Sequence, residues 1–587
     1  MPFDPRLHRA RGFTGPEPSP GPSLHRDCVA KRPGWQGRGQ PRGLREPGDG
    51  CGLQQKLMSD CNHLAGGGTE GLATFDRSFD VAMAISADSI VFGRRLSLAS
   101  FRPSRRPAVS RHLSAELAFA LTFGAVVFAL VLWFPGVLRD ADTLWHITTG
   151  EWILAHRAVP VVDTFSYTRV GQTWAPQEWL SEVILALAYR AAGWNGLLML
   201  TAAAAGSTVG IVALYIRRRV RFDVAAMLVL LMVACGGPSL LTRPHLIALP
   251  VLAYWTARLV SARERGVAPS LWLLPLMTVW ANLHGGFVFG LALTAALAVE
   301  AAFDPACRGG DMFLSWGRSW GVFILGAVVA ACANPRGIDG LLFPVRLMSM
   351  THLDQIQEWQ PSDLGHLGGM TVSILVAFYV GLTGSLRLPR FRVLLVAGLV
   401  FVTMQHMRYG QLTGVVAPLL IAQALGPAGP SVFPERMLCR IAGLIAAIAL
   451  CCRIGLPLHR IDEGSYAPTA LSRVPQDLRG RPVLNDYGFG GLLIFSGVKP
   501  FIDGRADLYG DDFLGMYISL VYAQRDVLDA VLCRYGIAWT MLPPGGIVTA
   551  LMDRTPGWRR LYSDGFAVIH VRESGGGTPV CPGLARD

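Results

Sequence analysis

Two aspartates one residue apart mark the part of this sequence best suited to chemistry. Asp140 and Asp142 follow directly after a long apolar stretch, and His146 comes four residues after Asp142. Residues four apart share one face of an α-helix, so Asp142 and His146 would lie together if this segment is helical. Two neighbouring carboxylates can take a proton from a hydroxyl or bind a divalent cation. The three residues are therefore candidate catalytic groups, with Mg²⁺ or Mn²⁺ as a cofactor that the pair could bind.

Further polar side chains recur where apolar stretches end. Arginine and histidine at such points could stabilise an anionic leaving group such as a phosphate. A simpler interpretation is that proline and glycine at these points only make turns. A charged group at the centre of a membrane helix costs ~2.5–3.5 kcal/mol, however, so a cluster at one membrane face indicates a functional site. The candidate substrate-binding residues are Arg243, His245, Asn282, His284, Glu178, Glu358 and Arg408.

Composition places these residues in a membrane protein. Of the 587 residues, 51% are hydrophobic and only 16% are charged, whereas soluble domains have about 25% charged residues. The net charge of +12 comes mostly from arginine, and no lysine- and arginine-rich run of the nucleic-acid-binding type is present. The 11 cysteines form no CxxC pair, which argues against a zinc site and against a disulfide framework.

The region 111–457 contains the apolar stretches and is predicted to be an all-α polytopic membrane domain. A stretch of about 20 apolar residues spans the hydrocarbon core, and about eleven transmembrane helices are expected. The short amphipathic piece 179–192 is predicted to be an interfacial or re-entrant helix instead. The predicted spans are 117–138, 195–216, 224–242, 246–261, 267–283, 285–302, 319–333, 367–386, 393–405, 409–430 and 438–456.

Arginine positions predict the orientation of this domain. With a cytoplasmic N-terminus, every inner loop carries at least two arginines, as the positive-inside rule requires. The first outer loop is then the long segment 139–178, and everything after about Leu458 is extracytoplasmic. The histidines provide an independent observation, because all those between residues 139 and 450 then fall on the outer side: His146, His156, His245, His284, His352, His366 and His406.

The two ends of the chain differ from the membrane region. Residues 1–110 are rich in Pro, Gly and Arg and lack periodicity, which is typical either of a disordered tail or of a start codon placed too far upstream, with Met58 or Met83 as the true start. Residues 458–575 are predicted to form a small α/β extracytoplasmic domain, followed by a tail at 576–587. Its expected elements are strands at 483–484, 492–495 and 537–542, a helix at 526–535 and a hairpin at 558–571.

This organisation resembles the GT-C superfamily of polytopic membrane glycosyltransferases, and within it the bacterial RgtA/B/C/D-like group. The segments that carry the resemblance are Asp140-Ala141-Asp142-Thr143-Leu144-Trp145-His146, Asp163-Thr164-Phe165-Ser166-Tyr167, Thr242-Arg243-Pro244-His245, Asn282-Leu283-His284-Gly285-Gly286, Glu358-Trp359-Gln360-Pro361, Asn485-Asp486-Tyr487-Gly488 and Phe501-Ile502-Asp503-Gly504-Arg505. In the best-understood members an acidic pair directly precedes aromatic residues. This chain departs from that pattern, which leaves open which aspartate is the base.

The resemblance implies a hexosyl- or pentosyltransferase in the bacterial inner membrane. Such an enzyme moves a sugar from a polyprenyl-phosphate donor to an envelope glycan, lipid or protein acceptor at the outer face. Asp142 is the first choice as base, because Asp140 directly follows Arg139 and could be held in an ion pair. The alternatives are a polytopic transporter or flippase, and a non-catalytic envelope assembly protein. A transporter would place charged residues near the bilayer midplane, whereas here they gather at one face.

Overall fold

The structure is a computed structural model that describes residues 114–304, 310–355, 359–383, 388–427, 429, 433–522 and 525–573. The N-terminal segment 1–110 and the tail 576–587, for which predictions were made above, lie outside these residues. Glu358, a candidate substrate-binding residue, also lies outside them. The predicted domain boundaries therefore stay predictions.

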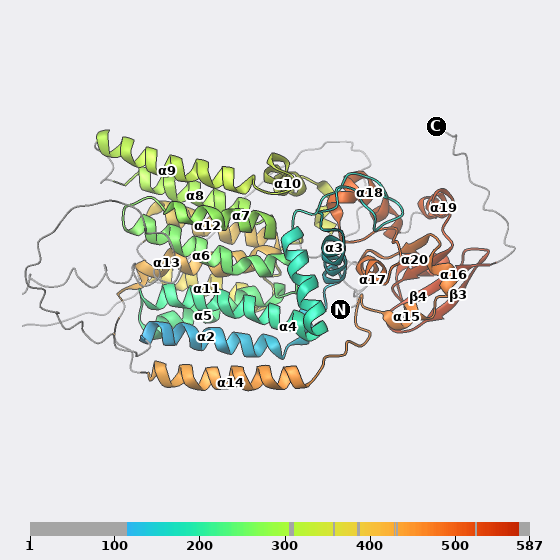
Figure 1. Cartoon of the computed structure of the whole chain (residues 1–587), viewed down its shortest axis with the longest axis horizontal. Coiled ribbons are helices and arrows are strands. Elements are labelled where there is room, and N and C mark those ends of the chain that lie inside the picture. Colours follow the sequence, from blue (N-terminus) through green and yellow to red (C-terminus); the bar gives the residue numbers. More distant parts are fainter. Residues whose placement is uncertain are drawn as a thin grey trace, which may run out of the picture. The chain divides into compact units, whose positions relative to one another are not determined.

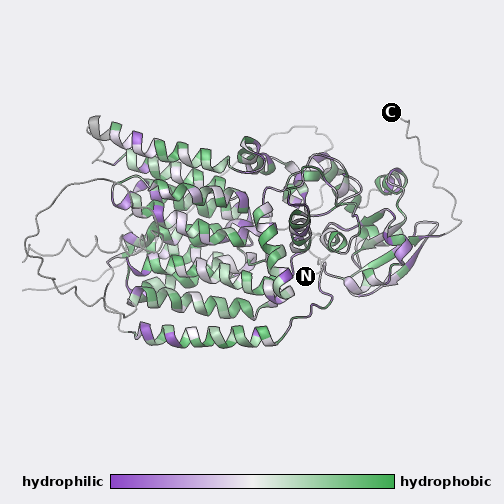
Figure 2. Cartoon of the chain, viewed as in Figure 1, coloured by the Kyte–Doolittle hydropathy of each residue, from purple (hydrophilic) through white to green (hydrophobic). Residues whose placement is uncertain are grey.

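The described chain is mostly helical, with one small sheet (Figure 1). Each predicted apolar stretch contains a helix, and these helices are coloured mainly as hydrophobic in Figure 2. They are α2 (Ala115–Leu132), α4 (Trp179–Arg217), α5 (Phe222–Gly236), α6 (Pro244–Glu264), α7 (Leu274–Leu283), α8 (Phe287–Ala302), α9 (Gly310–Ala331), α11 (Gly369–Leu382), α12 (Arg390–Gln405), α13 (Gly410–Ile421) and α14 (Glu435–Gly455).

Six helices among the described residues are long and apolar enough to cross a membrane. The segments that meet this standard are Ala115–Leu132, Trp179–Arg217, Phe222–Ser239, Pro244–Glu264, Leu314–Ala331 and Glu435–Gly455. Three shorter apolar helices cover Leu271–Leu283, Phe287–Ala302 and Gly369–Leu382. The chain is thus a multi-pass membrane protein by length and composition, and the count of about eleven spans stays a prediction.

Helix α4 is bent near its middle. Ala192 (φ −150°, ψ 25°) and Gly193 (φ 56°) leave the helical conformation, and the positive φ is one that glycine adopts readily. The predicted amphipathic helix 179–192 is therefore the first part of α4, and the kink separates it from the predicted span that follows. Because the kink changes the direction of the helix, the first part of α4 runs in a different direction from the apolar span that follows it.

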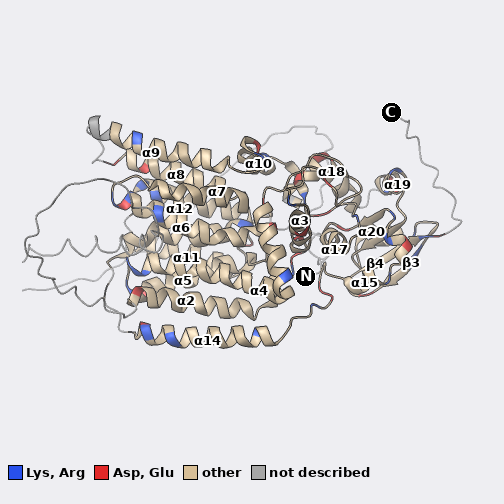
Figure 3. Cartoon of the chain, in the orientation of Figure 1, with Lys and Arg blue, Asp and Glu red and all other residues tan. Residues whose placement is uncertain are grey.

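Charged residues divide between the two ends of the helices (Figure 3). At one end, Arg217 pairs with Glu435 at 2.8 Å, and both side chains are buried. The pairs Arg219–Glu264, Arg263–Asp304 and Arg392–Glu300 join other helices at the same end. The opposite ends of α4, α6 and α8 carry the predicted site residues Glu178, Arg243 and His284. This segregation agrees with the predicted grouping of arginine loops, while the side of the membrane stays a prediction.

The C-terminal residues contain a four-stranded sheet, formed by β1 (Val483–Asn485), β2 (Trp539–Leu542), β3 (Trp558–Ser563) and β4 (Val568–Arg572). Its strand order is β1-β2-β4-β3; β1 and β2 are parallel, and the other neighbours are antiparallel. The predicted hairpin is confirmed as β3–β4, the strand at 537–542 as β2, and the helix at 526–535 as α19 (Arg525–Arg534). The remaining helices are α15 (Pro468–Ser472), α16 (Gln476–Arg479), α17 (Gly490–Phe495), α18 (Ala506–Val521) and α20 (Ile547–Met552).

The predicted strand at 492–495 is wrong, because these residues belong to helix α17. A short apolar run fits a buried helix as well as a buried strand, so its pattern could not distinguish them. The glycines before the run favour the helix, since they let α17 approach another element very closely. A Cβ atom on Gly491 would lie 2.1 Å from the backbone oxygen of Ala141. Helix α17 therefore packs against the segment that carries the two aspartates.

Candidate active site

The two aspartates lie at the start of helix α3 (Asp142–His156), so the segment is helical, which is the condition for Asp142 and His146 to share a helix face. Asp140 Oδ1 accepts a hydrogen bond from the backbone N–H of Asp142 at 2.9 Å. A carboxylate at this position satisfies one of the unpaired N–H groups of the first helical turn and suits the helix dipole. One turn further along, His146 is buried. The predicted catalytic group therefore occupies the first turns of one helix.

Arg243 joins both aspartates. Its Nη2 atom lies 2.8 Å from Asp140 Oδ1 and 2.8 Å from Asp142 Oδ2, and its Nε atom also pairs with Asp140 Oδ2. Arg243 immediately precedes Pro244, the first residue of α6, in an extended conformation, which is typical of a residue before proline. The Thr143 hydroxyl donates to the Thr242 carbonyl at 2.8 Å and ties α3 to this turn. Sequence segments about 100 residues apart thus meet at one ion cluster.

The aspartates are not equivalent. The Asp140 side chain is 3% exposed, and both of its oxygens interact with Arg243. The Asp142 side chain is 17% exposed. The sequence suggested an ion pair for Asp140 with its neighbour Arg139, but the partner is Arg243, because the exposed Arg139 lies outside this cluster. Asp142 is therefore the carboxylate that a substrate reaches more easily.

His146 packs against a glutamate that the site prediction did not include. His146 Nδ1 lies 3.3 Å from Glu182 Oε1, and both side chains are buried. Burial, followed by the nearby charge of Arg243, lowers the pKa of His146 well below its usual value. The imidazole is then neutral near pH 7. Glu182 comes four residues after the predicted Glu178, and this helical spacing is the sequence signal that could have identified it.

A second wall comes from the start of α4 and the turn between α7 and α8. Glu178 Oε1 lies 3.4 Å from His284 Nε2, and the His245 ring centre is 6.1 Å from that of His284. Burial raises the pKa of Glu178 to about 8, although the charges of Arg408 and Arg243 act in the opposite direction. Burial and the neighbouring His245 lower the pKa of His284. Near pH 7 this wall therefore presents a protonated carboxyl and a neutral imidazole.

Asn282 and Arg408 support this wall in different ways. Asn282 Oδ1 accepts from Trp179 Nε1 at 2.6 Å, and its Nδ2 donates to the carbonyls of Thr278 and Ala333, each at 2.8 Å. The Asn282 amide group is therefore occupied by hydrogen bonds within the protein. The sequence predicted that Asn282 binds substrate, whereas these bonds indicate that it positions the wall. Arg408 lies over the ring of Trp359 at 4.3 Å, close enough to Glu178 to affect its pKa.

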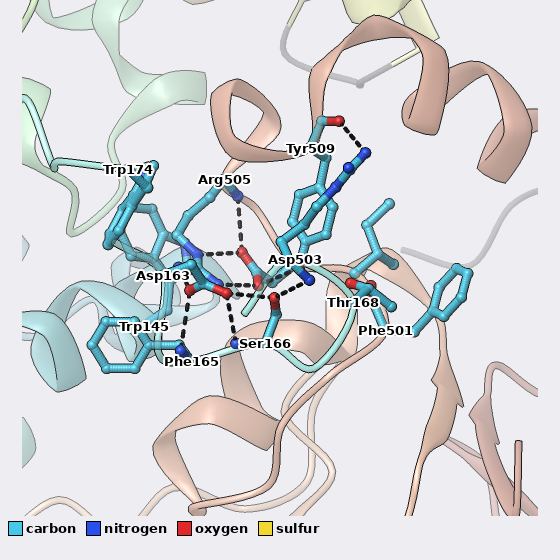
Figure 4. A network of polar contacts seen from close by, with 12 residues as sticks. Trp145, Asp163, Phe165, Ser166, Thr168, Trp174, Phe501, Asp503, Arg505 and Tyr509 are labelled. Atoms are coloured by element: carbon cyan, nitrogen blue, oxygen red, sulfur yellow. Dashed lines mark hydrogen bonds and ion pairs between the residues drawn. The ribbon is translucent and has the colours of Figure 1, made fainter. Parts of the chain in front are cut away.

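A buried ion network ties the loop after α3 to the C-terminal residues (Figure 4). Arg505 donates to Asp503 through Nε and Nη2, both at 2.7 Å, and to Asp163 through Nη1 at 2.6 Å. All three side chains are buried. Tyr509 donates its hydroxyl proton to Asp503 at 2.8 Å, and the Arg505 guanidinium lies 4.6 Å from the centre of the Trp174 ring. The sequence indicated both segments as motifs but gave no reason to pair them.

Asp163 remains ionised in this network despite its burial. Burial alone raises the pKa of a carboxyl group, but the Arg505 guanidinium and hydrogen bonds from Ser166 and Phe165 outweigh that effect, so the pKa of Asp163 lies below its usual value. The bonds from Ser166 are 2.6 Å from its hydroxyl and 3.1 Å from its backbone N–H. Buried ion pairs therefore connect the loop after α3 to the C-terminal residues.

The two carboxylates that could bind a metal ion both pair with arginine. Within the parts of the chain that the structure describes, no group of three or more His, Cys, Asp or Glu side chains is placed to hold a metal ion. Between the two aspartates lies the Arg243 guanidinium, which already supplies positive charge to both. The donor set around Asp140 and Asp142 therefore fits an arginine-paired carboxylate site better than a metal site.

Comparisons with known proteins find similarity among solved structures. No protein-family model matches the chain, and a search of curated proteins finds no match. The chain is similar to the crystal structure of ArnT from Cupriavidus metallidurans bound to undecaprenyl phosphate, with 14% identity and a TM-score of 0.44, over 78% of this chain and 98% of that one. A similarity at this level does not by itself establish a shared fold, so the function must be argued from the chain's own residues.

Proposed function

We propose that this chain is an integral membrane glycosyltransferase of the GT-C type, which transfers a sugar from a polyprenyl-phosphate donor to an envelope glycan, lipid or protein acceptor. The observation that carries the proposal is the convergence of Asp142, Arg243 and the Glu178–His284 pair at one end of an apolar helix bundle. Transfer from a lipid phosphate needs a base for the acceptor and positive charge for the leaving group. These residues supply both.

In the proposed reaction the acceptor hydroxyl attacks the anomeric carbon of the donor sugar. A bond forms between that carbon and the acceptor oxygen while the bond from the carbon to the phosphate oxygen breaks, and the lipid phosphate leaves with the electron pair. Asp142 takes the hydroxyl proton, because it is the more exposed of the two aspartates. Asp140 holds the Arg243 guanidinium and the N-terminal turn of α3, so it acts as a positioning residue.

The departing phosphate gains negative charge, and cationic or hydrogen-bonding groups can stabilise it. Arg243 and Arg408 supply positive charge, and the protonated Glu178 can donate a hydrogen bond to a phosphate oxygen. His245 and His284 complete this wall as hydrogen-bonding groups, and the lowered pKa of His284 keeps that imidazole neutral. The long polyprenyl chain would lie along the apolar helices, so the same end of the bundle can receive both the lipid and its head group.

We infer that the reaction needs no divalent cation, because Arg243 lies between the carboxylates that would otherwise bind one. Transfer by the purified protein should then continue in excess chelator, at a rate close to that without it. The measurement is release of polyprenyl phosphate in detergent with and without EDTA. Loss of activity in EDTA, with recovery on adding Mg²⁺ or Mn²⁺, would contradict this inference and leave the rest of the mechanism in place.

The proposed orientation puts the site at the outer face of a bacterial inner membrane, with the N-terminus cytoplasmic and the C-terminal residues extracytoplasmic. Its support is the separation of the arginine pairs at one end of the helices from the site residues at the other. A transporter or flippase would be favoured by charged groups midway along broken helices. In the described helices, the paired charges named above lie at helix ends instead.

Lipid-linked sugars test the proposed function directly. Deleting the gene should cause a lipid-linked sugar to accumulate and one glycan, lipid or protein to lose a sugar, and the wild-type gene should restore both. Mass spectrometry of lipid extracts and of the envelope fraction from the two strains measures this. The Asp142→Asn gene should restore neither, although its product reaches the membrane. Full restoration by that variant would show that Asp142 is not the base, whereas unchanged lipid-linked sugars after the deletion would contradict the proposed function.

A further inference from the structure

The C-terminal residues make direct contact with the proposed base. A Cβ atom on Gly504 would lie 1.9 Å from Asp142 Oδ1 and 2.6 Å from its carboxyl carbon. The Gly504 backbone is therefore already in van der Waals contact with the carboxylate, and no larger residue fits without a shift. A second close contact involves Ala141, the residue before Asp142. Gly491 of α17 packs against the backbone carbonyl of Ala141.

The φ of Gly504 lies outside the positive range, so its backbone conformation does not require glycine. Glycine is required at this position because the space for a side chain is occupied. Alanine could adopt the same backbone conformation, so the obstacle to a side chain is the Asp142 carboxylate. A carboxylate at the end of a side chain with two torsions moves more readily than a backbone does. A methyl group at position 504 should therefore displace the carboxylate and leave the fold in place.

The segment that contains Gly504 is held by its two neighbours. Asp503 and Arg505 form a bidentate ion pair, and Arg505 also reaches Asp163 in the loop after α3 (Figure 4). Phe501, two residues before Asp503, donates its backbone N–H to Asn485 Oδ1 at 2.7 Å, and Thr168 donates its hydroxyl to the Phe501 carbonyl at 2.7 Å. The contact at Gly504 thus belongs to a segment anchored on both sides.

We propose that the C-terminal α/β region completes the active site: the Asp503-Gly504-Arg505 segment forms the wall that orients the Asp142 carboxylate. Gly504 provides the contact, and Arg505 is a positioning residue that seats the segment through Asp503 and Asp163. This inference rests on the proposed function of Asp142. It assigns to this region a direct part in catalysis.

Gly504→Ala tests the proposal with a small change. Displacement of a reacting group by about 1 Å costs on the order of 10²-fold in rate, so kcat should fall by roughly that factor. The KM for the donor should change much less than kcat, because Arg408 and Glu178 are not touched and Arg243 keeps its contacts with Asp140. The matched control is Gly480→Ala, a glycine of the same region whose added Cβ meets nothing within 4 Å and whose φ is −82°. It should retain wild-type kinetics, and both variants should reach the membrane in normal amount.

A double-mutant cycle separates positioning from general structural damage. If Gly504 acts through Asp142, then Gly504→Ala should lower activity little further in an Asp142→Asn background. Full activity of Gly504→Ala alone, or an equal loss from it in both backgrounds, would overturn the positioning role. Full activity of Asp142→Asn alone would instead show that Asp142 is not the base, which is the assignment on which this inference rests. The two failures are therefore distinguishable in one set of four proteins.

Discussion

Asp142→Asn should lower turnover by about 10²–10⁴-fold, the usual contribution of a general base. Asparagine keeps the size of aspartate and can still accept a hydrogen bond from Arg243, so the contact between α3 and the turn before α6 should survive. It cannot take the proton of the acceptor hydroxyl. Transfer to a saturating acceptor by purified protein in detergent measures the loss, and the amount of protein in the membrane fraction shows that folding is preserved.

Asp140→Asn is the matched control for this prediction. It changes the same side chain two residues earlier, but Asp140 is almost fully buried and is occupied by Arg243 and the helix N-terminus. We therefore expect a smaller fall in turnover together with lower thermal stability. An inactive Asp140→Asn beside an active Asp142→Asn would exchange the roles of the two aspartates. If both variants stay active, the base lies elsewhere, and Glu178 becomes the next candidate.

Much of the helical framework could be predicted, because a span is a local property of sequence. Long apolar stretches must satisfy their backbone groups internally, and each of those indicated by the sequence contains a helix. The segment after the first apolar stretch is helical, so Asp142 and His146 are one turn apart, as the spacing of four residues implies for a helix. Short apolar runs were less informative: 492–495 formed a helix because the glycines before it permit close packing, which depends on a distant partner.

The candidate site was partly predictable for the same reason. Proline, glycine and the ends of apolar stretches predict chain turns at Arg243 and His284. The sequence could therefore place both turns at the same face of the membrane. Their partners could not be inferred. That Arg243 binds both aspartates, that Glu182 contacts His146 and that Arg505 binds Asp163 are tertiary contacts across 36 to 342 residues. Such pairings follow from packing, and a single sequence does not record them.

Arg505→Met should destabilise the folded protein by about 3–5 kcal/mol, because it leaves the buried carboxylates of Asp163 and Asp503 without their common cation. Methionine keeps much of the length and apolar character of the arginine side chain, so the loss comes mainly from charge. Removing one partner of a buried ion network is costly because the remaining charges stay away from water. The temperature of half-unfolding of the detergent-solubilised protein should fall by several degrees.

Arg525→Met is the control for this substitution. Arg525 pairs with Asp529 one helical turn away in α19, and the two side chains are 39% and 43% exposed. An exposed pair of this kind contributes at most about 0.5 kcal/mol, so Arg525→Met should unfold near the wild-type temperature. Adding Asp163→Asn to Arg505→Met should recover part of the lost stability, since it removes one of the uncompensated charges. Equal stability of the two single variants, or no recovery in the double variant, would show that the Asp163–Arg505–Asp503 network does not hold the loop to the C-terminal region.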